Sequence, residues 1–145
     1  MLKEMMSGRE LVCVQPDARI SEAARLMQLK NVGTVLVLSN GKPRGILTDR
    51  DIVVRCIAKN IDVSDCTVEN IMTESLEVCK DTDGLFDCIE LMRKAAVRRV
   101  PVVDRNGNAV GMISIGDILG VLSKEFSILT QVISAVEETQ QRMIA

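Results

Sequence analysis

The chain has 145 residues, of which 47% are apolar and 26% are charged, and its net charge is −2. This composition predicts a soluble globular protein the size of one ordinary domain, excludes a disordered chain and indicates no membrane span. Because no long basic run is present, we expect no binding to nucleic acids.

The first third of the chain predicts a strand followed by a helix. Residues 1–10 contain no apolar run of the kind found in a signal peptide, so we expect a cytoplasmic protein. Residues 11–14 are short and rich in β-formers, and Pro16 follows them. Ser21 is the expected N-cap of a helix over residues 22–29, which have helical apolar spacing.

A hairpin and a second helix follow. Residues 34–38 form a continuous apolar run that is too short for a helix, and residues 44–48 form a second run. The Asn40-Gly41 pair between them predicts a hairpin turn. A helix is expected from Asp49 to about Ile57.

The second half of the chain repeats this order. Leu26 and Asp51 of the first unit correspond to Leu91 and Asp117 of the second. The second unit predicts strands at 77–79, 99–103 and 110–114, helices at 84–95 and up to about 122, and a turn at Asn106-Gly107. We therefore predict a first repeat over residues 1–61, a linker over 62–76 that is helical at 68–71, a second repeat over 77–123 and a helical tail over 124–145. Because two units of about 60 residues would each be marginal alone, we expect them to share one core.

The tail carries a seam of apolar residues. Phe126, Leu129, Ile133 and Val136 recur at spacings of three and four, which is the a/d pattern of a helix that packs against another element. The pattern leaves open whether the seam packs on the chain's own core or on a second subunit.

The chain offers little material for catalysis or metal binding. It has no histidine, which removes the commonest general base and the usual partner of a nucleophilic serine or cysteine, so we expect no enzyme and no catalytic residues. The five cysteines lack the two-residue spacing of zinc ligands, so we expect no metal site and mostly buried cysteines in a reducing compartment. Met27, Met92 and Met112 are expected to fill the core.

Four strings of residues, each at its expected place in a repeat or ahead of one, resemble a known family. They are Gly45-Ile-Leu-Thr-Asp-Arg-Asp51, Asn70-Ile-Met-Thr73, Arg98-Arg-Val-Pro-Val102 and Gly111-Met-Ile-Ser-Ile-Gly-Asp117. With the order of elements, they resemble a tandem pair of cystathionine-β-synthase-type (CBS) domains over residues 12–123. The resemblance implies an α+β fold of two pseudosymmetric β-α-β-β-α repeats packed sheet to sheet, plus a C-terminal helix. In that family two clefts commonly bind adenosine-containing ligands, and the modules usually dimerise.

A hydroxyl and a carboxylate recur three residues apart in both repeats. The pairs are Thr48 with Asp51 and Ser114 with Asp117. Each pair is expected where a strand ends and a helix begins. The carboxylate could accept from two ribose hydroxyls, and the helix start and hydroxyl could bind a phosphate. The same spacing is that of a capping box, which needs no ligand. The spacing alone favours the cap, and the resemblance favours a ligand site in at least one repeat.

The two repeats differ on the strand expected to face the cleft. Arg98 and Arg99 are the best phosphate candidates, although a solvated edge or an ion pair with Asp104 or Asp117 would explain them as well. The sequence leaves open which cleft they serve. The adenine would lie among aliphatic side chains such as Val12, Ile46, Ile71, Met72 and Met112. The full candidate ligand-binding set is Thr34, Val35, Thr48, Asp51, Met72, Thr73, Arg98, Arg99, Val100, Pro101, Ser114 and Asp117.

These features predict a regulatory module that requires no cofactor. An adenine nucleotide (AMP, ADP or ATP) would act as the effector in the cleft between the repeats, and the output would go to an unknown protein partner in trans. We expect a homodimer with no nucleic-acid or membrane partner. The alternative is a structural dimerisation or protein-interaction module whose clefts are vestigial.

Overall fold

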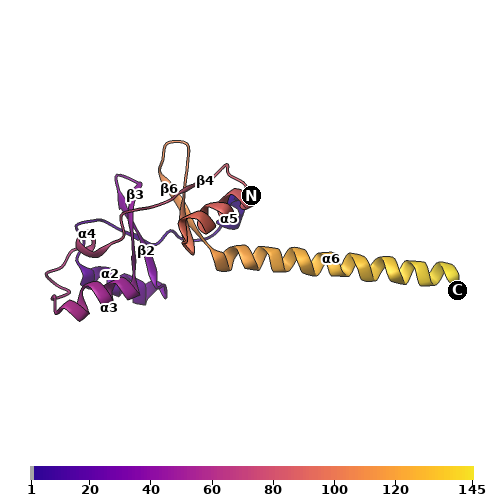
Figure 1. Cartoon of the computed structure of the whole chain (residues 1–145), viewed down its shortest axis with the longest axis horizontal. Coiled ribbons are helices and arrows are strands. Elements are labelled where there is room, and N and C mark those ends of the chain that lie inside the picture. Colours follow the sequence, from indigo (N-terminus) through magenta and orange to yellow (C-terminus); the bar gives the residue numbers. More distant parts are fainter. Residues whose placement is uncertain (1) are drawn as a thin grey trace. The chain divides into compact units, whose positions relative to one another are not determined.

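The computed structural model describes residues 2–145, so Met1 of the predicted first repeat lies outside the described residues. By its internal contacts the chain divides into two units, Met1–Ile113 and Ser114–Ala145. Figure 1 shows the elements in chain order. The larger unit carries two three-stranded sheets with their helices, which confirms the predicted α+β class.

The first sheet has the order β1-β2-β3. Its strands are β1 (Cys13–Val14), β2 (Thr34–Ser39) and β3 (Lys42–Thr48), with β1 parallel and β3 antiparallel to β2. Val35, Leu36 and Val37 are fully buried, because the central strand is covered on both faces. This is why β2 has a continuous apolar run in place of an alternating pattern.

Four short helical segments accompany this sheet: α2 (Ile20–Lys30), α3 (Asp49–Arg55), a 3₁₀ turn (Ile57–Lys59) and α4 (Val68–Ile71). Ile20, Ala23 and Met27 of α2 pack in one apolar cluster with Val35 and Val37 of β2. Their spacing of three and four places them on one helix face. The predicted helices are confirmed, with ends shifted by one or two residues.

The predicted N-cap of α2 is wrong. The helix begins at Ile20, and the backbone N–H of Arg19 donates to Glu22 Oε2 at 3.1 Å. The N–H groups of Ile20 and Ser21 donate to the backbone oxygens of Cys66 (2.9 Å) and Val63 (3.1 Å). Because a distant loop satisfies these first N–H groups, the helix needs no hydroxyl cap at position 21.

The hairpin between β2 and β3 is as predicted. Asn40 and Gly41 both have positive φ, 51° and 77°, which is the backbone of a type I′ turn. A register shift between Val37 and Leu38 precedes the turn. The Asn-Gly dipeptide thus sets the pairing of the two strands.

The second sheet contains β4 (Cys79–Lys80), β5 (Arg99–Val103) and β6 (Ala109–Ser114), with α5 (Leu85–Ala95) between β4 and β5. Its hairpin differs from the first. In residues 104–108 only Gly107 has a positive φ, whereas the turn of the first hairpin has two such residues, Asn40 and Gly41. The Asp104 carboxylate accepts from the N–H groups of Asn106 (2.8 Å) and Asn108 (2.9 Å). The hydrogen bond from the Asn108 backbone, followed by others in the loop, lowers the pKa of Asp104. The second hairpin therefore has a longer loop that the Asp104 carboxylate stabilises, whereas the first hairpin has a two-residue turn.

Four of the five cysteines are buried, as predicted, and Cys13 is exposed. Burial raises the pKa of Cys79 to about 12 and also raises that of Cys88. Both thiols are therefore protonated at neutral pH and act as small apolar groups. Met27 and Met92 are buried as expected, whereas Met112 is partly exposed.

A short N-terminal helix, α1 (Leu2–Met5), had no signal in the sequence pattern. Leu2 is fully buried and Met6 is 8% exposed. A Cβ on Gly111 of β6 would clash with Met6 Sδ, so Met6 packs against the backbone of β6. The first residues of the described chain are thus part of the core.

The second unit is α6 (Ile115–Ile144), one unbroken helix of 30 residues. The last helix of the second repeat and the tail helix, predicted separately, are continuous (Figure 1, orange to yellow). In residues 2–145, α6 is the one helix long and apolar enough to cross a membrane by length and composition, and an 18-residue stretch of it has a mean hydropathy of 1.3. Length and composition are weak criteria, because helices that pack in apolar interfaces meet them too.

Candidate functional site

A cavity of about 280 Å³ lies in the larger unit. Three segments far apart in sequence form its walls: β2, β3 and the start of α3; the chain between α4 and β4; and the chain entering β5. The lining residues are Thr34, Ile46, Thr48, Asp51, Thr73, Ser75, Leu76, Glu77, Val97, Arg98 and Arg99. Six of the predicted ligand residues therefore meet around one cavity.

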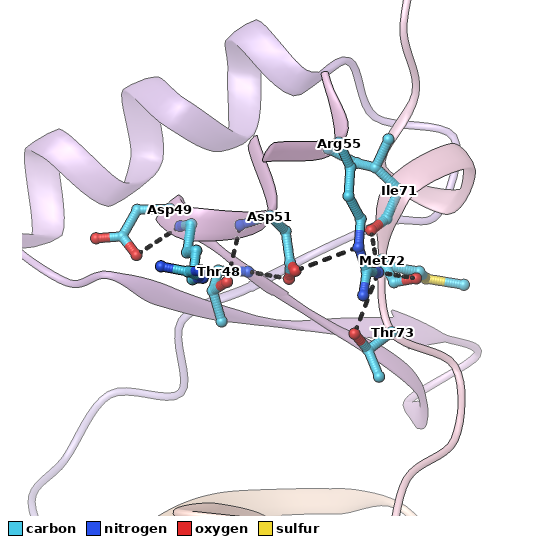
Figure 2. Close-up of polar contacts among 8 residues, drawn as sticks. Thr48, Asp49, Asp51, Arg55, Ile71, Met72 and Thr73 are labelled. Atoms are coloured by element: carbon cyan, nitrogen blue, oxygen red, sulfur yellow. Dashed lines mark hydrogen bonds and ion pairs between the residues drawn. The ribbon is translucent and has the colours of Figure 1, made fainter. Parts of the chain in front are cut away.

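Thr48 and Asp51 form the capping box that their spacing predicts. The Thr48 N–H donates to Asp51 Oδ2 at 2.9 Å, and the Asp51 N–H donates to Thr48 Oγ1 at 3.1 Å (Figure 2). The cap leaves hydrogen-bonding capacity on both side chains. The Thr48 hydroxyl accepts in this contact, so its own proton can still be donated to a ligand. A carboxylate has acceptor sites on both oxygens, so Asp51 can also accept from a ligand. The cap and the ligand interpretations are compatible, since the cap orients both side chains.

Arg55 is a site-forming residue that the sequence analysis missed. Its Nε lies 3.6 Å from Asp51 Oδ1, and its Nη1 donates to the backbone oxygen of Ile71 at 2.9 Å. The same nitrogen donates to Thr73 Oγ1 at 3.3 Å (Figure 2). Arg55 thus ties α3 to the segment after α4, and the spacing of four between Asp51 and Arg55 was the available signal.

The segment after α4 is held against the edge of β3. Ile46 and Thr73 exchange two backbone hydrogen bonds, at 3.0 and 2.9 Å. Gly45 makes the approach possible, because a Cβ there would lie 3.0 Å from the Thr73 oxygen and 2.5 Å from Met72 Sδ. This contact brings Ser75, Leu76 and Glu77 to the cavity, which the polar linker sequence did not indicate.

Thr34 has the one buried side-chain oxygen or nitrogen that lacks a hydrogen-bond partner within residues 2–145. It lines the cavity. Buried polar groups almost always have a partner, so an unmatched hydroxyl in a cavity wall points to a ligand or water at this position. Thr34 was among the predicted ligand residues.

The cavity carries both signs of charge. Arg98 and Arg99 line it from the chain entering β5 and are exposed, whereas Asp51 lines it from α3 and Glu77 from the chain between α4 and β4. Within the described chain neither arginine forms an ion pair with Asp104, which was one alternative explanation for the pair. The arrangement suits a ligand that has both an anionic group and neutral hydroxyl groups.

Comparison with known proteins agrees with this fold. The family model for the CBS domain matches residues 2–57 and again residues 68–124. The chain belongs to the CBS domain family. It is a tandem CBS pair, and such pairs are regulatory modules.

Two individual proteins illustrate the relationship of this CBS pair to its family. The CBS domain-containing protein YhcV of Bacillus subtilis is 38% identical over 109 residues, which cover 75% of this chain and 76% of YhcV. The solved structure of the CBS domain protein PAE2072 from Pyrobaculum aerophilum, complexed with AMP, is 28% identical. It superposes with a TM-score of 0.72, covering 85% of this chain and 98% of that protein.

An enzyme is also among the relatives of the CBS pair. The inosine-5′-monophosphate dehydrogenase of Thermoplasma acidophilum is 32% identical over 117 residues, which cover 81% of this chain. They amount to 23% of the dehydrogenase, so the match is to its CBS part. The resemblance therefore carries no dehydrogenase activity to this chain.

The other predicted ligand residues lie outside the cavity wall. Met72, Val35, Val100 and Pro101 are buried in the core of the CBS pair. Ser114 and Asp117 begin the second unit and form their own capping box, in which the Ser114 hydroxyl lies 2.7 Å from Asp117 Oδ2 and donates to it. The Ser114 hydroxyl proton is therefore used in the contact with Asp117, whereas the Thr48 hydroxyl proton is still available to a ligand. A ligand role for these six residues stays a prediction.

Proposed function

We propose that this CBS pair is a sensor that binds an adenine nucleotide in the cavity beside Thr48 and Asp51. The observation that carries the proposal is the meeting of the Thr48–Asp51 cap with Arg98 and Arg99 around one cavity. The AMP complex of the relative PAE2072 supports the choice of ligand class.

Each part of the nucleotide has a matching group in the wall. The Asp51 carboxylate accepts from the vicinal hydroxyls of the ribose. The guanidinium groups of Arg98 and Arg99 bind the phosphate, for which their planar forks are well suited. The adenine packs on aliphatic surface from Ile46, Leu76 and Val97. Of the aliphatic residues expected around the purine, Ile46 alone lines this cavity.

The size of the cavity favours a small nucleotide. Its volume of about 280 Å³ is at the lower end for ligand pockets. A monophosphate would be held inside, whereas the further phosphates of ADP or ATP would extend into solvent past the arginines. We therefore expect AMP to bind at least as tightly as ATP.

Nucleotide binding would be transmitted to the partner by a conformational change in the segment between the repeats. A ligand that touches both α3 and the start of β5 orders residues 73–77, which form the third wall of the cavity. It can shift a conformational equilibrium only as far as it binds one state better than the other. In this proposal the ordered state is read by a protein partner in trans, in the cytoplasm.

The test is isothermal calorimetry with AMP, ADP, ATP and inorganic phosphate on the full chain. Asp51→Asn keeps a cap acceptor and removes the charge, and the double variant Arg98→Ala with Arg99→Ala removes the phosphate forks. Each should weaken AMP binding about 10- to 100-fold, the loss expected for one or two charge-assisted hydrogen bonds. Arg105→Ala is the matched control, because Arg105 lies outside this cavity.

Two results would contradict the proposal. One is folded protein that binds none of the three nucleotides. The other is AMP binding that survives both the Asp51 and the arginine variants unchanged. Either would favour the second candidate function, an interaction module with vestigial clefts. The specific observation in its favour is the exposed apolar face of α6.

A further inference from the structure

The C-terminal helix carries an apolar face that is longer than the sequence seam indicated. Because α6 is continuous, the a/d pattern extends in both directions from the predicted positions 126–136. The heptad face consists of Leu119, Leu122, Phe126, Leu129, Ile133, Val136 and Met143, with Gln140 at the remaining a position. Each of the seven apolar side chains exposes at least 45% of its surface. A strict alternation of three and four over more than three heptads is the pattern of a coiled coil.

The rest of the helix is organised around this face. Ile128 and Val132 flank it on one side and are about half exposed. Positions on the other side are polar, with Lys124, Gln131 and Glu138 along one line of the helix. The helix is therefore amphipathic along its length, which is typical of a helix that packs by one face.

The heptad face continues well past the residues that belong to the second repeat. The helix that carries it has 30 residues. The corresponding helix of the first repeat, α3, has seven residues, and the second family match ends at residue 124. Six of the eight heptad positions thus follow, in sequence, the residues that the family model matches.

The exposed area is sufficient for a stable dimer. The seven side chains expose on the order of 700 Å² per helix, so pairing two helices would bury about 1,400 Å², within the roughly 1,200–2,000 Å² of a specific interface. We propose that α6 pairs with α6 of a second copy of this chain as a parallel, in-register coiled coil. This inference is independent of nucleotide binding.

Gln140 sets the orientation. In a parallel pair it meets Gln140 of the second copy, and the two amides hydrogen-bond to each other. In the antiparallel register that uses the whole face it meets Leu122, and its amide is left without a partner. A single polar residue at an a position commonly fixes register in this way.

A lipid bilayer is the competing occupant of an apolar helix. By length and composition α6 could span one. However, Lys124 and Glu125 fall within its apolar stretch, and charged side chains are costly in the middle of a membrane span. The polar line through Gln131 and Glu138 also favours pairing by one face over lipid on all sides.

The first experiment measures the mass of the full chain by light scattering. Leu129→Asp with Ile133→Asp places two charges in the heptad face, and Ser127→Asp with Gln131→Asp places the same charges on the polar face. We expect the first variant to have half the mass of the wild type and the second to keep the wild-type mass. Circular dichroism checks that both variants remain folded.

The second experiment tests the orientation by cross-linking with diamide, which oxidises two thiols to a disulfide. Gln140→Cys is made in a Cys13→Ser background, because Cys13 is the exposed native thiol. Facing a positions are close enough for a disulfide only in the parallel pair. Gln141→Cys, which points away from the face, is the control. We expect a covalent dimer from Gln140→Cys and monomer from Gln141→Cys.

Three outcomes would overturn the proposal. The first is a heptad-face variant with wild-type mass. The second is equal cross-linking at positions 140 and 141, or none at either. The third is flotation of the wild type with phosphatidylcholine–phosphatidylglycerol vesicles that the Leu129→Asp, Ile133→Asp variant abolishes, which would assign the face to a membrane.

Discussion

The close approach of the linker to β3 makes Gly45→Ala a sharp test of the fold. The new Cβ would lie 2.5 Å from Met72 Sδ and 3.0 Å from the backbone oxygen of Thr73. The Thr73 oxygen cannot retreat easily, because Thr73 is held by two backbone hydrogen bonds to Ile46. The substitution must therefore displace the segment that walls the cavity.

The magnitude follows from two opposing effects. Overpacking of a filled site costs about 1–3 kcal/mol. Replacing glycine where the backbone is not left-handed returns about 0.4–1 kcal/mol through the unfolded chain. The net prediction is a loss of about 1–2 kcal/mol in the free energy of unfolding. The equivalent Gly111→Ala should cost less, because the blocking atom there is the flexible end of Met6.

Urea denaturation followed by far-ultraviolet circular dichroism measures this change as a shift in midpoint at constant m-value. Gly120→Ala is the matched control, since nothing lies within 4 Å of its Cβ and it sits inside a helix. The control should be stabilised by up to about 1 kcal/mol. If Gly45→Ala were as stable as the wild type, the packing of the linker described above would be wrong.

Three further predictions concern single positions. Ala96, at the end of α5, has a left-handed backbone with φ 54°, so Ala96→Gly should raise stability by about 1 kcal/mol in urea titrations, and an unchanged midpoint would contradict this. Burial raises the pKa of Cys79 to about 12, so its stabilising contribution is complete below the unfolded thiol pKa and is lost as pH rises toward 12. Iodoacetamide should therefore label Cys13 well before Cys79 in mass spectra of native protein, and equal labelling would refute the burial. The hydrogen bond from Asn108 lowers the pKa of Asp104, so its contribution is present above the unfolded pKa and is lost as pH falls through the folded one. Asp104→Ala should thus be less stable than the wild type at neutral pH, and urea titrations in acid should show the gap closing; a gap that does not depend on pH would count against the carboxylate's role.

Local signals in the sequence determined the helices, the strands and the capping box at the start of α3. Asn40-Gly41 specifies its own turn, because both residues tolerate the positive φ that a type I′ turn requires. Thr48 and Asp51 cap α3 through hydrogen bonds that span three residues. Such features depend on neighbours in the chain, so their residue types and spacing are sufficient to predict them.

Tertiary structure decided what distant segments do to one another. The carbonyls of Cys66 and Val63 replaced the expected cap at Ser21, because a helix start needs acceptors from any source. Arg55 and Gly45 bring the linker to the cavity through contacts with Ile71, Met72 and Thr73 that no local pattern encodes.

The C-terminal helix shows the same division. The heptad spacing is local and was visible in the sequence, whereas the exposure of Leu129 and Ile133 is a property of the whole fold. Periodicity states which face of a helix is apolar, and burial depends on whether other residues reach that face. The physical reason is that hydrogen-bonded turns and caps close over a few residues, while packing is decided by groups that only folding brings together.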